Sequence, residues 1–187
     1  MKKIPSIFMR DFEGNPSLVT QNPEPQCDWV FKGEGVPTHK RDGTSCMVRR
    51  GALLKRYDAK GGKPAPVGFE PCQDPDPNTG HWPGWVPVGP DDKWHVWTFY
   101  VIHEGALDDG TYELCGPKLQ GNPERFSDHK MILHGSERLP DMPRDFEGIK
   151  GYLKMVQIEG LVFHHPDGRM AKIKRTDFGF DWPVKGS

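Results

Sequence analysis

The chain has 187 residues, with 25 lysines and arginines against 26 aspartates and glutamates. This length suits one domain with a hydrophobic core and leaves little room for a second domain. The balanced charge excludes binding to nucleic acid through a global positive field, so a nucleic-acid partner would have to meet a local basic patch.

Cysteine spacing and hydropathy narrow the class of protein further. The four cysteines form no closely spaced pair, which excludes a zinc ribbon and a small disulfide scaffold. We therefore expect reduced thiols in an intracellular, cytoplasmic protein. The first residues lack the apolar core of a signal peptide, and no run is long or apolar enough to cross a membrane.

The 22 glycines and 19 prolines favour short strands and long loops over a helical bundle. Residues 29–31 begin a predicted strand, and residues 46–57 predict a hairpin that turns near Gly51. Residues 61–90 are so rich in glycine and proline that they predict a long surface loop. Trp82 and Trp85 near its tip would either pin the loop to the body of the protein or stack on a nucleobase.

The second half of the chain adds further strands and one helix. Residues 94–104 are apolar without a clear period and fit either a strand or a helix. Short strands are predicted to begin at Thr111 and at Lys130. Residues 145–155 predict a short helix, because Phe146, Ile149 and Leu153 recur at helical spacing. The expected fold class is α+β, with antiparallel sheets and short helices.

Residues 158–175 predict a β-hairpin that turns at Asp167 and Gly168, the residue types suited to the positive φ angles of a type I′ turn. A two-residue turn there pairs Phe163 with Lys172. Alternation along the strands then places five side chains on one face: Glu159, Leu161, Phe163, Lys172 and Lys174. One carboxylate and two ammonium groups suit a metal ion and a phosphate better than a core. A shift of the pairing by one residue would move the side chains of one strand to the opposite face.

Four short motifs follow one another along the chain, and each is a weak signal when taken alone. They are Lys40-x-Asp42-Gly43, Tyr112-Glu113 before a Gly-Pro loop, Glu159-Gly160, and Lys172-Ile173-Lys174. In this order they resemble the motif series of the covalent nucleotidyltransferases, the superfamily of polynucleotide ligases and mRNA-capping guanylyltransferases. The segments Glu-Leu-Cys-Gly-Pro, Gly-Asn-Pro and Leu-His-Gly are most similar to the RNA ligases, namely the phage branch and the small single-domain 5′–3′ ligases of vertebrates.

The resemblance assigns roles to the motif residues. It implies that Lys40 is the nucleophile that takes AMP from ATP as a phosphoramidate and that Glu113 binds the ribose hydroxyls. It also implies that Lys172 and Lys174 contact the α-phosphate. A nucleophilic lysine requires desolvation or nearby positive charge, which favours the unprotonated amine.

Further residues complete the predicted site. The resemblance implies that Glu159 is the metal-associated carboxylate, and Asp42 is the other predicted metal ligand. It also implies that Arg56, with Lys55 as the alternative, contacts the reacting nucleotide and the RNA end. Thr38 and His39, beside the nucleophile, would offer backbone groups to the adenine. The family's aromatic ring over the adenine has no counterpart in residues 131–134, so Leu133 or His134 would pack on the base.

The resemblance implies a single ATP-grasp-like nucleotidyltransferase (ligase adenylation) domain over residues 1–187, without a C-terminal OB domain. ATP and Mg²⁺, with Mn²⁺ as the alternative ion, are the implied cofactors. RNA with 5′-phosphate and 3′-hydroxyl ends is the implied partner of an expected monomer. The implied activity is ATP-dependent RNA ligation. Three alternatives stay open: a DNA or nick ligase, a capping-type nucleotidyltransferase, and a non-catalytic relative that binds RNA ends.

Overall fold

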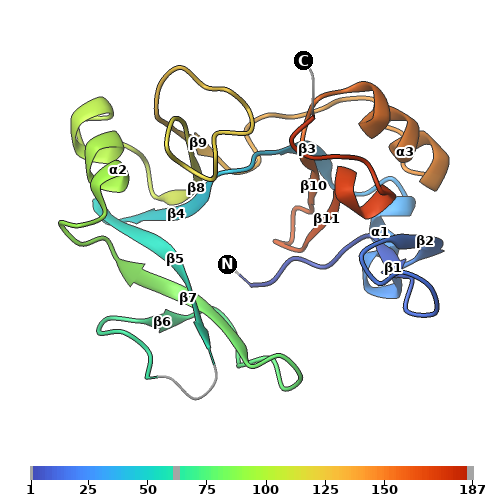
Figure 1. Ribbon diagram of the computed structural model, residues 1–187, viewed down its shortest axis with the longest axis horizontal. Helices are drawn as coiled ribbons and strands as arrows, with labels where there is room; N and C mark the ends of the chain where they lie inside the picture. The colour runs from blue at the N-terminus through green and yellow to red at the C-terminus, as the bar shows by residue number, and fades with distance from the viewer. Residues whose placement is uncertain (1, 61–63, 185–187) are drawn as a thin grey trace. The chain divides into compact units, whose positions relative to one another are not determined.

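A computed structural model describes residues 2–60 and 64–184 (Figure 1). Its internal contacts divide the chain into two units, residues 1–3 with 42–134 and residues 4–41 with 135–187. Each unit has its own sheet and its own apolar core. Pairings between the strands of the described residues are antiparallel and the helices are short, so the α+β prediction is confirmed.

The first unit, residues 1–3 with 42–134, is built on a six-stranded sheet in the order β6-β7-β5-β4-β8-β9. Its strands are β4 (Thr44–Arg49), β5 (Ala52–Lys60), β6 (Glu70–Pro71), β7 (His81–Pro87), β8 (Gly110–Cys115) and β9 (Lys130–Leu133). The helix α2 (Lys93–Val96) continues directly into the π-helix η2 (Trp97–Ile102). The segment that fitted either a strand or a helix is therefore helical, and it buries Phe99 in the core of this unit.

The predicted hairpin over residues 46–57 is confirmed as β4 and β5. Arg49 pairs with Ala52, so the turn consists of Arg50 and Gly51. Both residues have positive φ, 52° and 74°, as a type I′ turn requires. The predicted strands at Thr111 and Lys130 are likewise present as β8 and β9.

The glycine- and proline-rich segment 61–90 contains the strands β6 and β7, so the prediction of a surface loop throughout is wrong for Glu70–Pro71 and His81–Pro87. The longer strand, β7, pairs with β5 along its whole length. Pro83 accepts a hydrogen bond from Cys72 on the β6 side, whereas Val88 donates to Leu53 on the β5 side. Since alternate residues face alternate neighbours, the prolines of β7 remove no donor from the ladder with β5. Residues 61–63 of the segment lie outside the described residues.

The two tryptophans of this segment pack against their own unit. Trp85 is 5% exposed. Trp82 donates from Nε1 to the Gln73 carbonyl at 2.9 Å and packs edge-to-face on Phe69. These contacts favour the interpretation in which the tryptophans pin the segment to the body of the protein.

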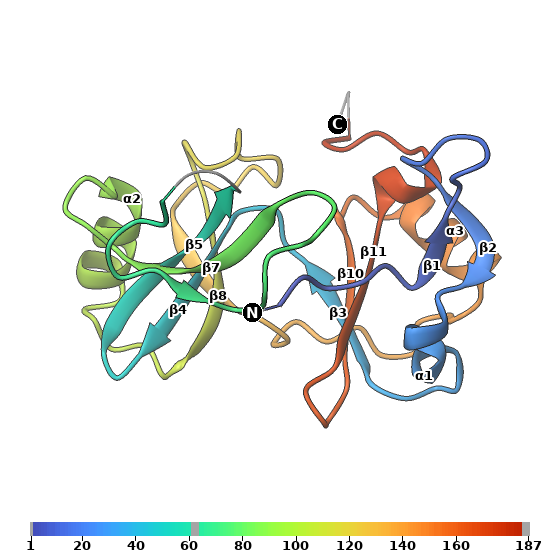
Figure 2. The same ribbon diagram turned by 90° about the horizontal axis from the view of Figure 1, so that it is seen from below.

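The second unit, residues 4–41 with 135–187, contains the three-stranded sheet β11-β10-β3 and the two-stranded sheet β1-β2. Its strands are β1 (Phe8–Arg10), β2 (Val19–Pro23), β3 (Val36–Lys40), β10 (Gly160–His164) and β11 (Met170–Lys174). Its helices are η1 (Pro25–Cys27), α1 (Asp28–Phe31), α3 (Phe146–Met155) and η3 (Arg175–Phe178). Figure 2 shows β3, β10 and β11 side by side. Isolated bridges extend this sheet at both edges, from Ser6 to Lys172 and from Thr38 to Arg138.

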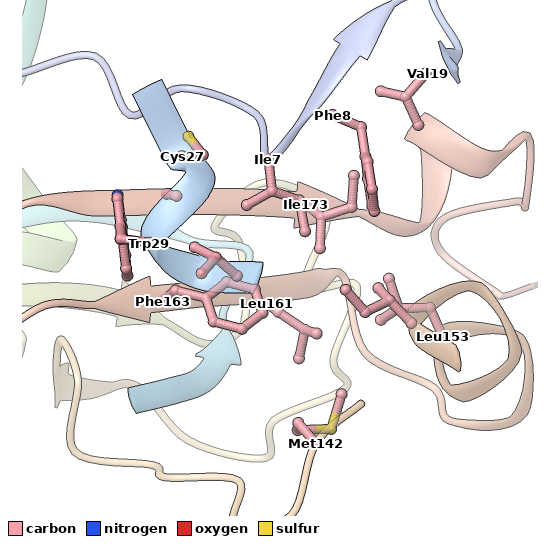
Figure 3. Close-up of a cluster of buried hydrophobic side chains, with 13 residues drawn as sticks. Ile7, Phe8, Val19, Cys27, Trp29, Met142, Leu153, Leu161, Phe163 and Ile173 are labelled. Carbon is pink, nitrogen blue, oxygen red and sulfur yellow. The ribbon is translucent and has the colours of Figure 1, made fainter. Parts of the chain in front are cut away.

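The core of the second unit lies against one face of the three-stranded sheet (Figure 3). The predicted helix is confirmed as α3, where Ile149 and Leu153 are fully buried and the Asp145 side chain caps the first turn by accepting from the Gly148 amide.

The predicted strand at residues 29–31 is wrong, because these residues form the last turn of α1. A run of three apolar residues has no period that distinguishes a strand from a helix.

The hairpin of β10 and β11 turns through three residues, so the predicted two-residue turn is wrong. His165 donates its backbone N–H to the Arg169 carbonyl, and Gly168 donates to the His165 carbonyl, at 2.9 and 3.0 Å. Pro166 and Asp167 are therefore the central residues of a turn. Proline suits the first central position because its φ is fixed at about −65°. Gly168 follows with a φ of 90°, as in hairpins with a glycine bulge.

The longer turn shifts the register of the hairpin by one residue from the predicted register. Lys172 pairs with Val162 and Lys174 pairs with Gly160, so the predicted pairing of Phe163 with Lys172 is wrong. The two lysines still share a face, but the fully buried apolar residues lie on the opposite face: Leu161, Phe163, Ala171 and Ile173. The hairpin thus has a core face and a polar face.

Among the helices of residues 2–60 and 64–184, none is long and apolar enough to cross a membrane.

Candidate functional site

Three lysines lie on the polar face of the three-stranded sheet, and we call them the lysine face: Lys40, Lys172 and Lys174. In the sheet ladder, Gly160 of β10 pairs with Lys40 of β3 on one side and with Lys174 of β11 on the other. Two residues further along β10, Val162 pairs with Lys172. Residues directly opposite one another, and residues two apart in one strand, point to the same side of a sheet. The ladder therefore gathers three ammonium groups from two distant parts of the chain.

Glu159 supplies the nearest negative charge to the lysine face. Its carboxylate forms an ion pair with Lys40 Nζ, and Glu159 is 9% exposed. Glu159 lies just before β10 and its carbonyl accepts from the Arg175 amide at 2.8 Å, which fixes the backbone at this point. The predicted association of Glu159 with the lysines is thus present in the structure, although it arises through β3 and not through the predicted hairpin register.

Lys172 is partly buried and lies among charged side chains. Burial lowers its pKa, and the positive charges of Lys40 and Lys174 lower it further, against the opposing effect of Glu159 and Asp177. A lowered pKa means that the surroundings disfavour the ammonium form, as expected where like charges are held together. The folded unit therefore carries a positive cluster that an anion would relieve.

Asp177 holds the end of β11 in place. Its carboxylate accepts from the Lys174 backbone amide at 2.8 Å and pairs with Arg10 at 2.9 Å, and Asp177 is 2% exposed. This carboxylate belongs to η3, which begins directly after Lys174. The backbone of Lys174 is thus fixed by a buried, charge-assisted hydrogen bond.

Gly160, between two of the lysines, has no room for a side chain. A Cβ there would overlap the Ile173 carbonyl and lie 2.8 Å from the Lys174 Cα. Any larger residue would push β11 away from β10 and disturb the spacing of the lysine face. This close approach of two backbones explains the glycine in the Glu159-Gly160 motif.

A pair of charged side chains holds the end of the strand that carries Lys40. Arg41 donates to both carboxylate oxygens of Glu137, from Nε at 2.7 Å and from Nη2 at 2.5 Å. The Glu137 carbonyl also accepts from the His39 amide at 3.0 Å. Bidentate pairs of this kind fix orientation as well as adding energy. Residues 39–41 are thereby attached to residue 137, and Lys40 lies between the two attachments.

Thr38 and His39 already use several of their polar groups within this unit. The Thr38 hydroxyl donates to the Val162 carbonyl at 3.0 Å, and Thr38 is 1% exposed. The His39 amide is engaged by Glu137, and by alternation its side chain lies on the opposite side of β3 from Lys40. Their predicted contacts with adenine stay predictions.

His39 makes the stability of the protein sensitive to acid. Its Nε2 is buried without a hydrogen-bond partner in the described residues. Burial, with added repulsion from Arg41 and Lys40 and a smaller opposing effect of Glu137, lowers its pKa to about 4. As pH falls below about 6.5, the unfolded chain binds this proton before the folded protein does, so stability is lost.

We expect the free energy of unfolding to fall by on the order of 3 kcal/mol between about pH 6.5 and 4 because of His39 alone. Urea unfolding of the wild type and of His39→Gln across this range measures the contribution. The variant should lose distinctly less stability than the wild type. Parallel curves for the two proteins would contradict this account of His39.

The first unit contains a second group of predicted site residues around Glu113 of β8. One oxygen of its carboxylate accepts from the Gly43 amide at 3.0 Å, and the other lies 2.9 Å from His134 Nε2. The remaining ring nitrogen, His134 Nδ1, is buried without a partner in the described residues. Gly43 has no space for a Cβ, which would lie 2.8 Å from Cys115 Sγ. The glycine of the Asp42-Gly43 motif thus permits close packing on β8.

Other predicted residues of the first unit are placed as follows. Lys55 and Arg56 point to opposite faces of β5: Lys55 pairs with Asp92, while the Arg56 guanidinium lies 5.7 Å from the centre of the Trp85 ring. Leu133 is 45% exposed at the end of β9. The Asp42 amide donates to Glu124 at 2.9 Å. The predicted roles of these residues stay predictions.

Comparison with known proteins gives one consistent result. The family model described as RNA ligase 1 matches residues 102–187. RNA ligase 1 of Danio rerio is 26% identical over 267 residues, covering 98% of this chain and 82% of that protein. RNA ligase 1 of Pongo abelii and of Rattus norvegicus are 25% and 29% identical with the same coverage.

The resemblance to the RNA ligases is therefore confirmed. The segment matched by the family model contains Glu113, Glu159, Lys172 and Lys174, and Lys40 lies before it. The similarity to each of these RNA ligase 1 proteins extends over nearly the whole chain and so includes residues of both units.

Sequence reasoning missed the residues that hold the lysine face in place. Asp177 follows Lys174 by three residues at the start of a helical turn, which is the spacing of a helix-capping side chain. This contact could therefore have been predicted from the sequence. Arg41 and Glu137 are 96 residues apart, and no local pattern predicts such a pair.

Proposed function

We propose that this chain is an ATP-dependent RNA ligase that joins 5′-phosphate and 3′-hydroxyl RNA ends through a lysyl-AMP and an adenylylated RNA. The observation that carries the proposal is the lysine face, where three lysines share one side of a sheet with Glu159 and Asp177 as the neighbouring carboxylates. A positive excess on a partly buried surface suits a polyphosphate and the phosphate at an RNA end. The similarity to RNA ligase 1 supports the choice of RNA.

Lys40 is the proposed nucleophile. Its amine must leave Glu159 and lose its proton before it attacks the α-phosphorus of ATP, from which pyrophosphate departs. An oxygen of the RNA 5′-phosphate then attacks the same phosphorus, and the Lys40 amine leaves. Finally the RNA 3′-hydroxyl attacks the activated 5′-phosphate, AMP leaves, and a phosphodiester bond is formed.

Lys172 and Lys174 are the proposed electrostatic groups. Phosphoryl-type transfer leaves the protein mainly to position the reactants and stabilise charge. The two lysines belong to a strand fixed by Asp177 and paired to β10, so their charges need little rearrangement. In the first unit, Glu113 is the proposed ribose-binding residue, and its carboxylate is oriented by Gly43 and His134.

Glu159 offers one carboxylate beside the lysine face, so a divalent ion held there would take its other ligands from phosphate and water. The described residues hold no group of three or more histidine, cysteine, aspartate or glutamate side chains suited to a metal. Mg²⁺ commonly binds through one or two carboxylates together with substrate phosphates. We propose that Glu159 holds Mg²⁺ or Mn²⁺ in this way, where the ion would neutralise phosphate charge. The role of Asp42 as a second ligand stays a prediction.

A ligation assay tests the proposed function. Purified protein is incubated with Mg²⁺, α-labelled ATP or GTP, and RNA with 5′-phosphate and 3′-hydroxyl ends. We expect sealed RNA with ATP and not with GTP. Comparable labelling by GTP would indicate a capping-type enzyme, and sealing restricted to nicked DNA would indicate a DNA ligase. RNA binding without transfer of label would indicate a non-catalytic relative.

A further inference from the structure

Arg138 extends the lysine face at the outer edge of β3. It forms an isolated antiparallel bridge with Thr38, which in turn pairs with Val162, the partner of Lys172. Directly opposite residues point to the same side of a sheet, so Arg138 projects from the same side as the lysines. Lys40 is two residues further along β3, which places the Cα atoms of Lys40 and Arg138 about 8 Å apart.

The guanidinium of Arg138 is available to a ligand. Arg138 is exposed, and within residues 2–60 and 64–184 its side chain makes no hydrogen bond or ion pair. Its backbone, by contrast, lies in a fixed segment, because the flanking residues Glu137 and Leu139 hydrogen-bond to His39 and Pro37 of β3 at 3.0 and 2.9 Å. When Arg138 binds an anion, its side chain has to be ordered but its backbone does not.

A cavity of about 400 Å³ opens beside Arg138, and we call it the Arg138 pocket. Its apolar walls include Val36, Pro37, Leu139 and Pro140. A second cation, Arg144, lines it as well. The Arg144 guanidinium donates to the carbonyls of Val30 and Gly35 at 3.0 and 2.8 Å, and also to that of Glu34, so neutral groups hold it in place.

The charge of the Arg138 pocket favours a polyanion. Two arginines line the pocket, with Asp141 as the carboxylate among the lining residues. Single-stranded nucleic acid is commonly bound by a positive groove that follows the backbone, with apolar surfaces beside it for the bases. The pocket offers both features, and its Arg138 lies about 8 Å from Lys40 between Cα atoms.

We propose that the Arg138 pocket binds the RNA strand next to the end being joined, with Arg138 contacting one of the first backbone phosphates from that end. The inference rests on the proposed function, because the lysine face would hold the RNA end itself. Arg138 acts in RNA binding and takes no part in the reaction of Lys40 with ATP.

RNA binding and lysine adenylylation, measured separately, test this inference. Wild type, Arg138→Ala, Arg138→Lys and the control Lys154→Ala are compared. Lys154 is an exposed lysine of α3, and its substitution removes the same charge from the same unit. Binding of a short 5′-phosphorylated single-stranded RNA is measured by fluorescence anisotropy at several salt concentrations. Adenylylation is measured with ATP and Mg²⁺ in the absence of RNA.

We expect Arg138→Ala to weaken RNA binding roughly tenfold, as for loss of a hydrogen bond to a charged group. The slope of log affinity against log salt should fall by about 1. Arg138→Lys should retain much of the affinity, and Lys154→Ala should bind as the wild type does. Adenylylation without RNA should be unchanged in all of them.

A modified RNA sharpens the test. Neutral methylphosphonate linkages are placed one at a time at the first three positions from the 5′ end. At one position the loss of wild-type affinity should match the loss caused by Arg138→Ala, and the two losses should not add, since both remove the same contact.

Two results separate failure of this inference from failure of the proposed function. If the wild type adenylylates and seals RNA while Arg138→Ala binds RNA as tightly as Lys154→Ala, the inference is overturned and the proposed function stands. If the wild type takes no label but its RNA binding depends on Arg138, the proposed function fails and the pocket stands as an RNA site.

Discussion

Replacement of Lys40 by arginine is expected to abolish adenylylation, with a loss on the order of 10⁴-fold or more, as for removal of a nucleophile. Arginine keeps the positive charge, but its guanidinium stays protonated and cannot attack phosphorus. Transfer of label from α-labelled ATP to the protein measures the effect.

Arginine is a sharper replacement than alanine because of the contact that Lys40 makes. A lysine at the edge of a loop would have little packing to lose, and Lys40→Ala would then leave the fold intact. In the structure Lys40 is the last residue of β3 and pairs with the buried Glu159. Alanine would leave that carboxylate without this partner, at a cost in stability.

Two outcomes decide the Lys40 prediction. Lys40→Arg should still seal RNA that already carries the 5′-adenylyl group, at least in part, because only the first step uses the amine. Label attached to Lys40→Arg at the rate of the wild type would contradict the assignment of the nucleophile.

Lys172→Ala and Lys174→Ala are each expected to lower adenylylation about 100-fold, the effect of removing one preorganised charge near a transferring phosphoryl group. Their melting temperatures should change little. For Lys172, removal of a crowded positive charge relieves repulsion from Lys40 and Lys174 and thereby offsets the lost packing of its side chain.

Ile173→Ala, between these two lysines, is expected to have the opposite effect. Ile173 is fully buried on the core face, so truncation should destabilise the protein by roughly 2–5 kcal/mol. Its adenylylation rate, measured well below the melting temperature, should largely persist. If Ile173→Ala removes activity from a folded protein while both lysine variants retain it, the division of β11 into a core face and a lysine face is wrong.

The sequence predicted the elements of the hairpin and the lysines on it, but not their register. The Pro166-Asp167-Gly168 segment contains two turn signals, Asp-Gly for two residues and Pro-Asp-Gly for three, and the second one determines the structure. The alternation of Lys172 and Lys174 with Ile173 settles which residues share a face within one strand whatever the turn length. The length of the turn decides only which residues of β10 lie on the same face as the two lysines.

Non-local contacts account for what the sequence could not predict. The pairing of β3 with β10, which brings Lys40 beside Glu159 and Lys174, joins segments more than a hundred residues apart. The strand β7 was not predicted because of its prolines. That these prolines leave the hydrogen bonds to β5 intact can be seen only when the neighbouring strands are known. The order of the motifs, by contrast, was readable directly and led to the correct family resemblance.

The intact mass of the purified protein after incubation with ATP and Mg²⁺ tests the central claim most directly. The proposal predicts a mass increase of one AMP on the wild type, mapped by peptide sequencing to Lys40 and removed by excess pyrophosphate or by 5′-phosphorylated RNA. A wild-type protein that is folded, binds ATP and yet gains no AMP, or gains it on another residue, would contradict the account.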